Sequence, residues 1–247
     1  TGHSMRNIPS WVDLATPDVA TAARFYTQLL GWRVEATTTP MGDYLVARTG
    51  DREVGGMMAV ADVPAGWTLF FDVADVDDAA ARASEAGGRV LEAPFDLPDG
   101  RAAVLADPTG AMFGVLSGIP QHEPWMSRER GAVRWTELLS RDPAAAEAFY
   151  AVLFGWKATT DLGGVAYTTF ALDDEPVAGM MLMPDTVPVG APSQWSVYFA
   201  VDDCAEAAAT TVRLGGRVLL EPKRVGAETF AVLADPTGAT CNVMADA

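Results

Sequence analysis

Hydrophobic positions along this chain recur in short alternating runs, which are typical of strands with one buried face. Two predicted helices interrupt these runs in the first half. Asp18 caps one helix, which ends at Gly31, and Asp75 caps the other, which ends at Gly87. The strand-like runs cover residues 8–15, 44–48, 54–60, 67–73, the region of Val90, 102–105 and 111–116. One strand, a helix and three strands occur twice in this order, which predicts an α+β fold.

The second half of the chain repeats the first. Residues 103–111 recur without change as residues 231–239, and Phe25-Tyr26 recurs as Phe149-Tyr150. Six of the seven tryptophans also pair across the two halves. Ordered matches of this number indicate a tandem duplication. We therefore expect a tag remnant and start Met at 1–5, one module at 6–117, a linker at 118–131 and a second module at 132–247.

The charge balance excludes several classes of partner. The formal net charge is −16 and the pI is about 4.3, so the chain lacks the basic surface that nucleic acids or anionic membranes require. No apolar run reaches the ~20 residues that span a bilayer, and no export signal is visible. The two cysteines are too few for a disulfide framework, which favours reduced thiols and a cytoplasmic location. An acidic surface also favours cationic ligands.

The motifs together resemble those of the vicinal oxygen chelate superfamily, which includes glyoxalase I, bleomycin-resistance proteins and extradiol dioxygenases. They are a strand and a helix with Phe25-Tyr26, then Leu30-Gly31-Trp32, and later the turn Asp107-Pro108-Thr109-Gly110 before a last strand. The resemblance covers residues 8–244 and is greatest to tandem glyoxalase-like proteins of high-GC bacteria. It implies that the two βαβββ units of each module form a curved mixed sheet that encloses a cavity.

Enzymes of this superfamily hold a divalent metal through His or Gln, His, and Glu on the first, fifth and last strands. Carried over by resemblance, these positions are Trp11, Thr68 and Gly114 in the first module and Trp135, Ser196 and Asn242 in the second. Tryptophan and glycine offer no ligand atom, and neutral hydroxyls and amides bind transition metals weakly. Outside the expected tag remnant the chain has one histidine, His122. We therefore expect no metal and no cofactor.

Strand alternation predicts a pocket in each module with an aromatic, sulfur-containing and acidic lining. Asp13 and Glu137 share the faces of Trp11 and Trp135, and each carboxylate is a candidate general base. Gly114 in place of a glutamate should free volume, and the second pocket should be the more polar. The expected ligand-binding residues are Trp11, Asp13, Met57, Thr68, Phe70, Met112 and Gly114 in the first module and Trp135, Glu137, Met181, Ser196, Tyr198, Thr240 and Asn242 in the second.

Several of these candidates also have a purely structural interpretation. Trp11 and Trp135 are suited to filling the core of a small barrel, and Asp13 is suited to pairing with Arg48 or to an exposed rim. A pocket that stays open favours a flat, partly apolar ligand with a hydrogen-bond donor or a positive charge.

Three functions are compatible with this pattern. The leading hypothesis is a metal-free small-molecule binder, for example one that sequesters a drug or natural product as bleomycin-resistance proteins do. The first alternative is a lyase, isomerase or oxygenase that acts on an aromatic or dicarbonyl metabolite with Asp13 or Glu137 as base. The second alternative is a non-catalytic structural or interaction protein. Because one chain supplies two modules, we expect a monomer or a weak homodimer.

Overall fold

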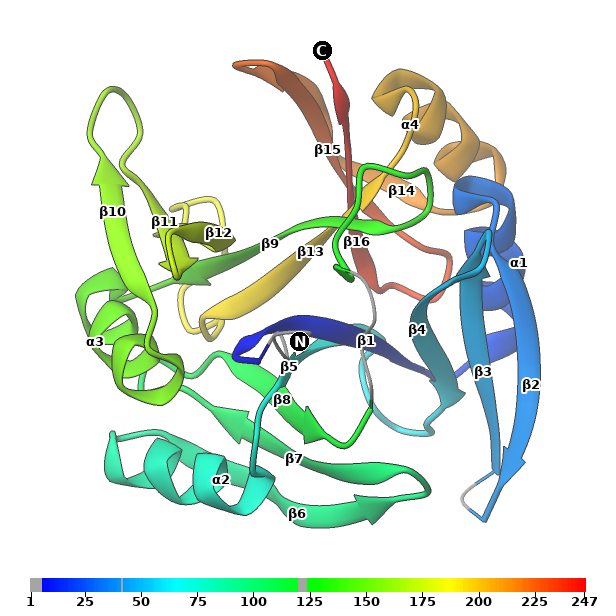
Figure 1. The fold of residues 1–247 in the computed structure, drawn as a ribbon. Helices are drawn as coiled ribbons and strands as arrows, with labels where there is room; N and C mark the ends of the chain where they lie inside the picture. Colours follow the sequence, from blue (N-terminus) through cyan, green and yellow to red (C-terminus); the bar gives the residue numbers. More distant parts are fainter. Residues whose placement is uncertain (1–5, 41, 120–123) are drawn as a thin grey trace. The chain divides into compact units, whose positions relative to one another are not determined.

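The computed structural model describes residues 6–40, 42–119 and 124–247, which form sixteen strands and four helices (Figure 1). The elements of the first half are β1 (Ile8–Thr16), α1 (Val19–Leu30), β2 (Arg33–Thr39), β3 (Gly42–Thr49), β4 (Arg52–Ala59), β5 (Gly66–Asp72), α2 (Val76–Glu85), β6 (Arg89–Leu97), β7 (Gly100–Ala106) and β8 (Met112–Ser117). Those of the second half are β9 (Val133–Ser140), α3 (Pro143–Phe154), β10 (Lys157–Asp161), β11 (Tyr167–Leu172), β12 (Glu175–Leu182), β13 (Gln194–Ala200), α4 (Cys204–Arg213), β14 (Arg217–Val225), β15 (Glu228–Ala234) and β16 (Thr240–Asp246).

Each half of the chain forms one eight-stranded mixed sheet. The strand orders are β2-β3-β4-β1-β5-β8-β7-β6 and β10-β11-β12-β9-β13-β16-β15-β14. The parallel pairs β1–β4 and β5–β8 recur as β9–β12 and β13–β16. The predicted α+β class, with two βαβββ units in each half, is therefore confirmed. Both sheets are open in their strand order, with β2 and β6, or β10 and β14, at the edges.

The predicted helix ends agree with the backbone geometry. Oδ1 of Asp18 accepts a hydrogen bond from the Thr21 amide at 3.1 Å, and α1 ends at Gly31 with a φ of 73°. Asp142 and Gly155 have the same roles in α3. A left-handed φ is unfavourable for a residue with a Cβ. The repeated glycine before each Trp is thus explained by helix termination.

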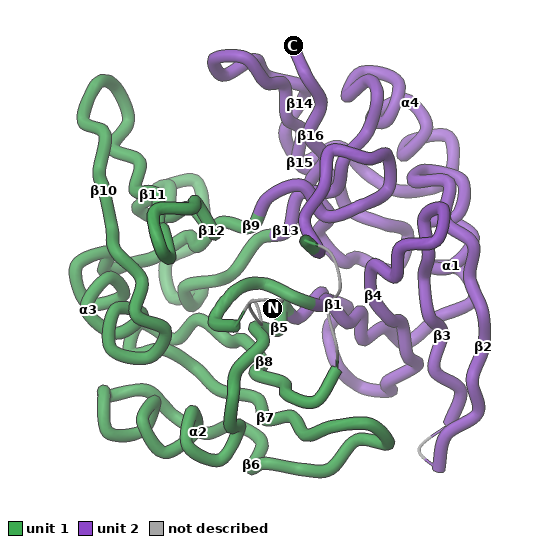
Figure 2. The backbone as a smooth tube through the Cα atoms, in the orientation of Figure 1, with its two compact units in different colours: residues 1–10, 69–124, 136–196 green, residues 11–68, 125–135, 197–247 purple. Residues whose placement is uncertain are grey.

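The chain folds into two compact units, and their boundaries do not coincide with those of the two sheets (Figure 2). Unit 1 comprises residues 1–10, 69–124 and 136–196, and unit 2 comprises residues 11–68, 125–135 and 197–247. Unit 2 holds α1 from the first half and α4 from the second, and these two helices are in contact. Unit 1 holds α2 and α3, which are also in contact. Each unit therefore combines one βαβββ portion from each copy of the repeat.

A buried tyrosine–aspartate pair joins the two copies within unit 2. Tyr26 on α1 donates to Oδ2 of Asp235 at 2.7 Å, and Trp67 Nε1 donates to the Tyr26 hydroxyl at 3.0 Å. Oδ1 of Asp235 accepts from the amides of Thr237 and Ala239 in its own turn. Both Tyr26 and Asp235 are buried, so a lost partner would cost about 1–3 kcal/mol.

The same pair occurs in unit 1 with the copies exchanged. Tyr150 on α3 donates to Oδ2 of Asp107 at 2.8 Å, and Trp195 Nε1 donates to the Tyr150 hydroxyl at 3.0 Å. Burial raises the pKa of both Tyr26 and Tyr150 well above its ordinary value, which keeps both hydroxyls protonated as donors. The segment that repeats without change therefore supplies, in each copy, the acceptor for a tyrosine of the other copy.

Packed aromatic rings surround each of these tyrosines. In unit 2 the Tyr26 ring lies 5.4 Å from Trp32 and 5.3 Å from Trp67. In unit 1 the Tyr150 ring lies 5.5 Å from both Trp156 and Trp195. Two of the three repeated tryptophan pairs thus belong to the cores of the units rather than to a ligand site.

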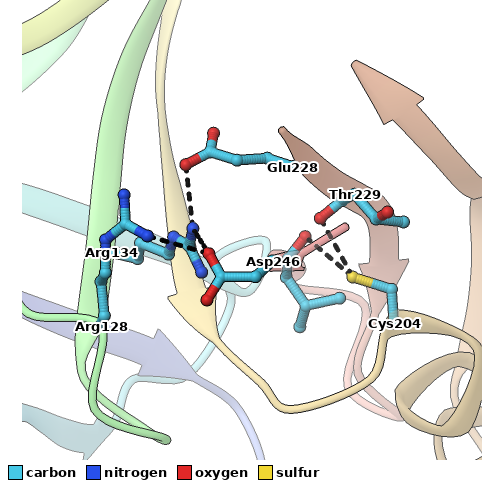
Figure 3. Close-up of polar contacts among 7 residues, drawn as sticks. Arg128, Arg134, Cys204, Glu228, Thr229 and Asp246 are labelled. Atoms are coloured by element: carbon cyan, nitrogen blue, oxygen red, sulfur yellow. Dashed lines mark hydrogen bonds and ion pairs between the residues drawn. The ribbon is translucent and has the colours of Figure 1, made fainter. Parts of the chain in front are cut away.

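A charged network anchors the last strand in unit 2 (Figure 3). Arg134 on β9 donates to Oδ1 of Asp246 at 2.7 Å and to Oε1 of Glu228 at 2.9 Å, and its side chain is 6% exposed. Arg128 reaches the same Asp246 oxygen at 2.9 Å. The Cys204 thiol at the start of α4 donates to the Thr229 carbonyl at 3.3 Å. Loss of the carboxylates would leave a shielded guanidinium unpaired, so these contacts hold β15 and β16 in place.

The segment expected as the linker contains a buried tryptophan. Trp125 is 5% exposed, and its Nε1 donates to the Val54 carbonyl at 2.9 Å. This tryptophan therefore packs against β4 within unit 2. Residues 1–5, the expected tag remnant, and His122 lie outside the described residues.

Two expectations from composition also have structural counterparts. Cys204 and Cys241 are buried and form no disulfide. In the described part of the chain, no helix has both the length and the apolar character needed to cross a membrane.

Candidate functional site

The first strand of the first copy carries a hydrogen-bonded cluster in unit 2. Trp11 Nε1 donates to Oδ1 of Asp13 at 3.0 Å and to the Tyr44 hydroxyl at 3.0 Å. Tyr44, on β3, donates to the same Asp13 oxygen. Arg48 binds Glu53 instead of Asp13. The expected carboxylate and tryptophan therefore lie together, with a tyrosine that completes a triangle of polar contacts.

A glycine makes room for this cluster. Gly56 on β4 is the register partner of Asp13. A Cβ built on Gly56 would lie 1.8 Å from the Tyr44 hydroxyl oxygen, so any larger residue would displace the tyrosine from the carboxylate. Gly56 is thus required by the position of the Tyr44 side chain, whereas Gly55 is required by Val12, whose carbonyl oxygen would lie 2.4 Å from a Cβ at position 55.

The Asp13 carboxyl is largely surrounded by protein atoms and accepts hydrogen bonds from two side chains. Burial raises its pKa above the ordinary value, although hydrogen bonds from Tyr44 and Trp11 oppose that rise. Both donors bind Oδ1, while the residue as a whole is only half-buried. Among the described residues, no donor binds Oδ2. The protein therefore holds one carboxylate oxygen through two hydrogen bonds and the other through none from the described residues.

The methionine beside this cluster is Met58 rather than the expected Met57. Met58 pairs with Ala15 and with Tyr44, so it shares the face of Asp13. Met57 pairs with Leu14 and is fully buried on the other face of β4. In the second copy the expected Met181 pairs with Tyr167 and lies on the carboxylate face.

The second copy places an equivalent carboxylate–tyrosine pair in unit 1. Tyr167 on β11 donates to Oε2 of Glu137 at 2.8 Å. Glu137 is the register partner of Gly179, as Asp13 is of Gly56. Glu137 is 8% exposed and therefore more deeply buried than Asp13. Trp135, which precedes it on β9, is half-buried and belongs to unit 2.

In the first copy, the Phe70 ring on β5 occupies the space beside Gly114 on β8 that was expected to be free. Phe70 on β5 is the register partner of Gly114 on β8. A Cβ built on Gly114 would lie 2.1 Å from the Phe70 ring. Phe70 is 8% exposed, and Gly114 is buried beneath it. Gly114 thus admits a phenylalanine side chain and leaves no space for a ligand there, which corrects the expectation of extra volume.

The equivalent strands of the second copy carry polar groups. Tyr198 on β13 is the register partner of Asn242 on β16, and both are buried. The Tyr198 ring meets the Phe230 ring of β15 edge to face at 6.2 Å. All three residues belong to unit 2. At these positions the second copy thus carries two polar side chains where the first carries Phe70 and Gly114; the greater polarity expected for the second pocket stays a prediction.

The remaining expected residues lie nearer the surface. Thr68 and Ser196 are half-buried, Met112 is 47% exposed, and Thr240 is exposed. The expected lining of each module is divided between the two units, with Phe70, Met112, Gly114, Glu137, Met181 and Ser196 in unit 1 and the others in unit 2.

Sequence reasoning missed Tyr44 and Tyr167. A signal for both was present, because they hold equivalent positions in the repeat, with the same separation as Met58 and Met181. Each lies on the hairpin strand beside the glycine that pairs with the carboxylate. A tyrosine repeated opposite a repeated carboxylate predicts a hydrogen-bonded pair on one face of a sheet.

The donor set does not fit the divalent metal that the superfamily implies. The three carried-over positions hold Trp11, Thr68 and Gly114 in the first copy, and Gly114 is covered by the Phe70 ring. In the second copy the positions hold Trp135, Ser196 and Asn242. Among the described residues, no group of three or more His, Cys, Asp or Glu side chains is arranged to hold an ion. Neither set supplies the charged or imidazole ligands that such metals need.

Comparison with known proteins gives a consistent result. Residues 8–115 match the Glyoxalase/Bleomycin resistance protein/Dioxygenase superfamily, and residues 135–244 match the Glyoxalase-like domain. The chain is 35% identical to "Putative glyoxylase CFP32" of Mycobacterium tuberculosis, over 96% of this chain and 94% of that protein. It is 36% identical to "Anthracycline biosynthesis protein DnrV" of Streptomyces peucetius, over 96% of this chain and 92% of that protein.

Solved structures share the fold at low sequence identity. The Mn(II)-bound glyoxalase from Novosphingobium aromaticivorans has a TM-score of 0.67 at 18% identity, over 97% of this chain and 82% of that chain. The 2,3-dioxygenase LapB from Pseudomonas sp. KL28 has a TM-score of 0.65 at 14% identity, over 96% and 91%. With two matching domains and relatives aligned over nearly its whole length, this chain belongs to the glyoxalase/bleomycin resistance protein/dioxygenase superfamily.

Proposed function

We propose that this protein binds a small organic molecule without a catalytic metal, through the carboxylate–tyrosine pair of each copy. The observation that carries the proposal is the Asp13 carboxylate, whose Oδ1 is held by Tyr44 and Trp11 while Oδ2 accepts from no donor among the described residues. Such an arrangement orients one carboxylate oxygen toward a ligand and places an indole ring beside it. It suits a ligand that carries a hydrogen-bond donor or a positive charge on a flat apolar body.

The ligand class that we propose is a planar aromatic natural product. The net charge of −16 favours a cationic group on the ligand. The relative DnrV is named as an anthracycline biosynthesis protein, and anthracyclines have a planar polycyclic skeleton. Sequestration of such a compound, or its handling during biosynthesis, would use the same binding step. We further propose that the protein works as a monomer or weak homodimer in the cytoplasm, where its two unpaired cysteines would stay reduced.

Quenching of tryptophan fluorescence by 2-hydroxyanthraquinone tests the binding function. We expect saturable quenching by the wild type, and a loss of affinity of about tenfold in Asp13→Asn, because the variant loses the negative charge and alters the hydrogen bonds to Tyr44 and Trp11. Asp51→Asn is the matched control, since Asp51 is an exposed carboxylate outside the cluster. Quenching that does not saturate would favour a structural or interaction role.

Metal analysis of protein purified without chelator tests the second part of the proposal. We expect less than one equivalent of any transition metal per chain, because neither donor set fits one. A stoichiometric transition metal would overturn the metal-free proposal.

The raised pKa of Asp13 favours a second candidate function, a metal-free isomerase with Asp13 as general base. Oδ2 would take a proton from the hydroxyl-bearing carbon of an α-hydroxyketone, which leaves an enediolate. The hydroxyl proton would pass to the former carbonyl oxygen, and Oδ2 would return its proton to the former carbonyl carbon, so that the net reaction is an isomerisation to the α-hydroxyaldehyde. Deuterium exchange at the hydroxymethylene carbon of 2-hydroxyacetophenone in D₂O, followed by NMR, tests this step. Exchange that the protein accelerates and that Asp13→Asn abolishes would support catalysis, whereas equal exchange with and without protein would exclude it for this substrate class.

A further inference from the structure

A buried side-chain oxygen in unit 2 accepts no hydrogen bond from the described residues. Asn242 on β16 is 4% exposed, and among the described residues its side-chain Oδ1 accepts no hydrogen bond. A buried amide oxygen without a donor destabilises the folded protein. Native proteins rarely keep such an atom unless water, an ion or a ligand satisfies it.

Alternation along β16 shows on which face of the sheet the Asn242 side chain lies. The Cys204 thiol of α4 contacts the Thr229 carbonyl of β15 (Figure 3) and the Val243 carbonyl of β16. Cys241 and Val243 are buried, and they alternate with Asn242 along β16. Because successive strand residues point to opposite faces, Asn242 lies on the face opposite to these two residues.

Aromatic rings accompany Asn242 on its own face. Tyr198 is its register partner on β13 and Val232 is its register partner on β15. Phe230, two residues before Val232, packs edge to face against the Tyr198 ring. The unpartnered oxygen is therefore bordered by two aromatic side chains and one aliphatic side chain, all within unit 2.

The first copy lacks this arrangement. Its equivalent of Asn242 is Gly114, which is covered by the Phe70 ring and provides no side-chain acceptor. Among the described residues, one further buried side-chain atom has no partner, Thr136 Oγ1 on β9, which lies between Trp135 and Glu137 and hence on the opposite face of the strand from both. Asn242 thus distinguishes the second copy from the first at an equivalent position.

We propose that Asn242 accepts a hydrogen bond from an O–H or N–H group on a planar aromatic ligand, whose ring packs against Tyr198 and Phe230. This proposal rests on the proposed binding function and adds a selectivity to it. A site at Asn242 in unit 2 would select ligands with a hydroxyl or amino group that points toward this oxygen, whereas the equivalent Gly114 provides no side-chain acceptor.

A pair of probes that differ by one methyl group tests this selectivity. 2-Hydroxyanthraquinone carries a free O–H donor, and 2-methoxyanthraquinone carries none. For the wild type we expect about tenfold tighter binding of the hydroxy compound, measured by tryptophan quenching. In Asn242→Leu, which retains the number and branching of the side-chain heavy atoms, that ratio should fall to about twofold or less, with affinity for the methoxy compound retained. An acceptor that the wild type and Asn242→Leu share would contribute equally to the affinity ratio of both proteins. A difference between the two ratios therefore reports on Asn242 alone.

Thr136→Val is the matched control, because it removes another buried oxygen that has no hydrogen-bond partner among the described residues, in unit 1 rather than unit 2. It should leave the ratio unchanged. Circular dichroism and thermal melting establish that each variant is folded, and Asn242→Asp, which retains an acceptor, should preserve the preference if the leucine variant does not fold.

The outcomes separate this inference from the binding function. Saturable binding of both probes by the wild type with equal affinity would overturn the role of Asn242 and leave the binding function intact. An unchanged ratio in folded Asn242→Leu would overturn it in the same way. Binding of neither probe would overturn both proposals for planar quinones.

Discussion

The two copies have different side chains on the strands that we propose to face a ligand, and the same side chains in the tyrosine–aspartate pairs that join one copy to the other. At equivalent positions the first copy has Phe70 over Gly114, and the second has Tyr198 beside Asn242. By contrast, the Tyr26–Asp235 and Tyr150–Asp107 pairs have the same chemistry and nearly the same length, 2.7 and 2.8 Å.

This difference indicates which residues stabilise the fold that both copies share. A tyrosine of one copy needs the aspartate turn of the other copy, so a change in either would leave a buried polar group without its partner. Phe70 and Tyr198, by contrast, have their register partners, Gly114 and Asn242, within their own copy. The chemistry of the two faces could therefore diverge while the scaffold stayed the same.

The largest predicted effect tests the equivalence of the scaffold pairs. Asp235→Ala and Asp107→Ala should each lower the free energy of unfolding by more than about 3 kcal/mol, because each removes the acceptor for a buried tyrosine and for two turn amides. Urea denaturation measures both values. Costs that differ by more than about 1 kcal/mol would contradict the view that the pairs are equivalent.

A smaller effect tests the filled strand pair of the first copy. Gly114→Ala should destabilise the protein by about 1–3 kcal/mol, because the new Cβ would lie 2.1 Å from the Phe70 ring. Gly66→Ala, on the same strand as Phe70, is the control, since a Cβ there meets nothing within 4 Å. Thermal denaturation measures both variants. Equal melting temperatures would show that Phe70 does not occupy the space above Gly114.

A buried carboxylate that exists in one copy alone provides a pH test. Burial, opposed by Arg6, raises the pKa of Asp72 to about 6, whereas the equivalent position of the second copy is Ala200. A raised folded-state pKa contributes stability at low pH that is lost as the pH rises through 6. Compared with Asp72→Asn, the wild type should therefore gain about 2 kcal/mol of unfolding free energy between pH 7.5 and pH 4.5. Parallel pH profiles of the two proteins would disprove this contribution.

The smallest predicted effect compares the carboxylate–tyrosine pairs. Tyr44→Phe removes one donor from Asp13 and should raise the pKa of that carboxyl further, with a stability cost of about 1 kcal/mol. Titration of the carboxyl carbon by NMR measures the pKa. Trp11→Phe serves as the matched variant, because it removes the other donor to the same oxygen. An unchanged Asp13 pKa in both variants would mean that neither donor influences the carboxyl.

Much of the fold could be predicted because it depends on local chemistry. The caps at Asp18 and Asp142 and the left-handed glycines at 31 and 155 act within a few residues, so their pattern in the sequence is sufficient. The face shared by Trp11 and Asp13 also follows from strand alternation. Alternation could not choose between Met57 and Met58, since that choice depends on the register between β1 and β4.

The partners of the site residues required contacts that no local pattern encodes. Tyr44 reaches Asp13 from another strand, and Gly56 matters only because that ring crosses it. Gly114 suggested an open space, but the length of a neighbouring side chain, Phe70, decided the outcome. Side-chain packing between strands sets such details, and it depends on three-dimensional distances.

The sequence by itself determined the duplication, the α+β class, the absence of a fitting metal donor set and the acidic, tryptophan-bearing first strands. These properties depend on residue identity and periodicity, which can be read along the chain. The tertiary structure alone decided that the turn aspartates, Asp107 and Asp235, accept from tyrosines of the opposite copy, and that Asn242 keeps a buried oxygen without a partner. Both facts concern hydrogen bonds between distant segments, and a buried polar group is satisfied or left unpaired only once the folded chain has placed its neighbours.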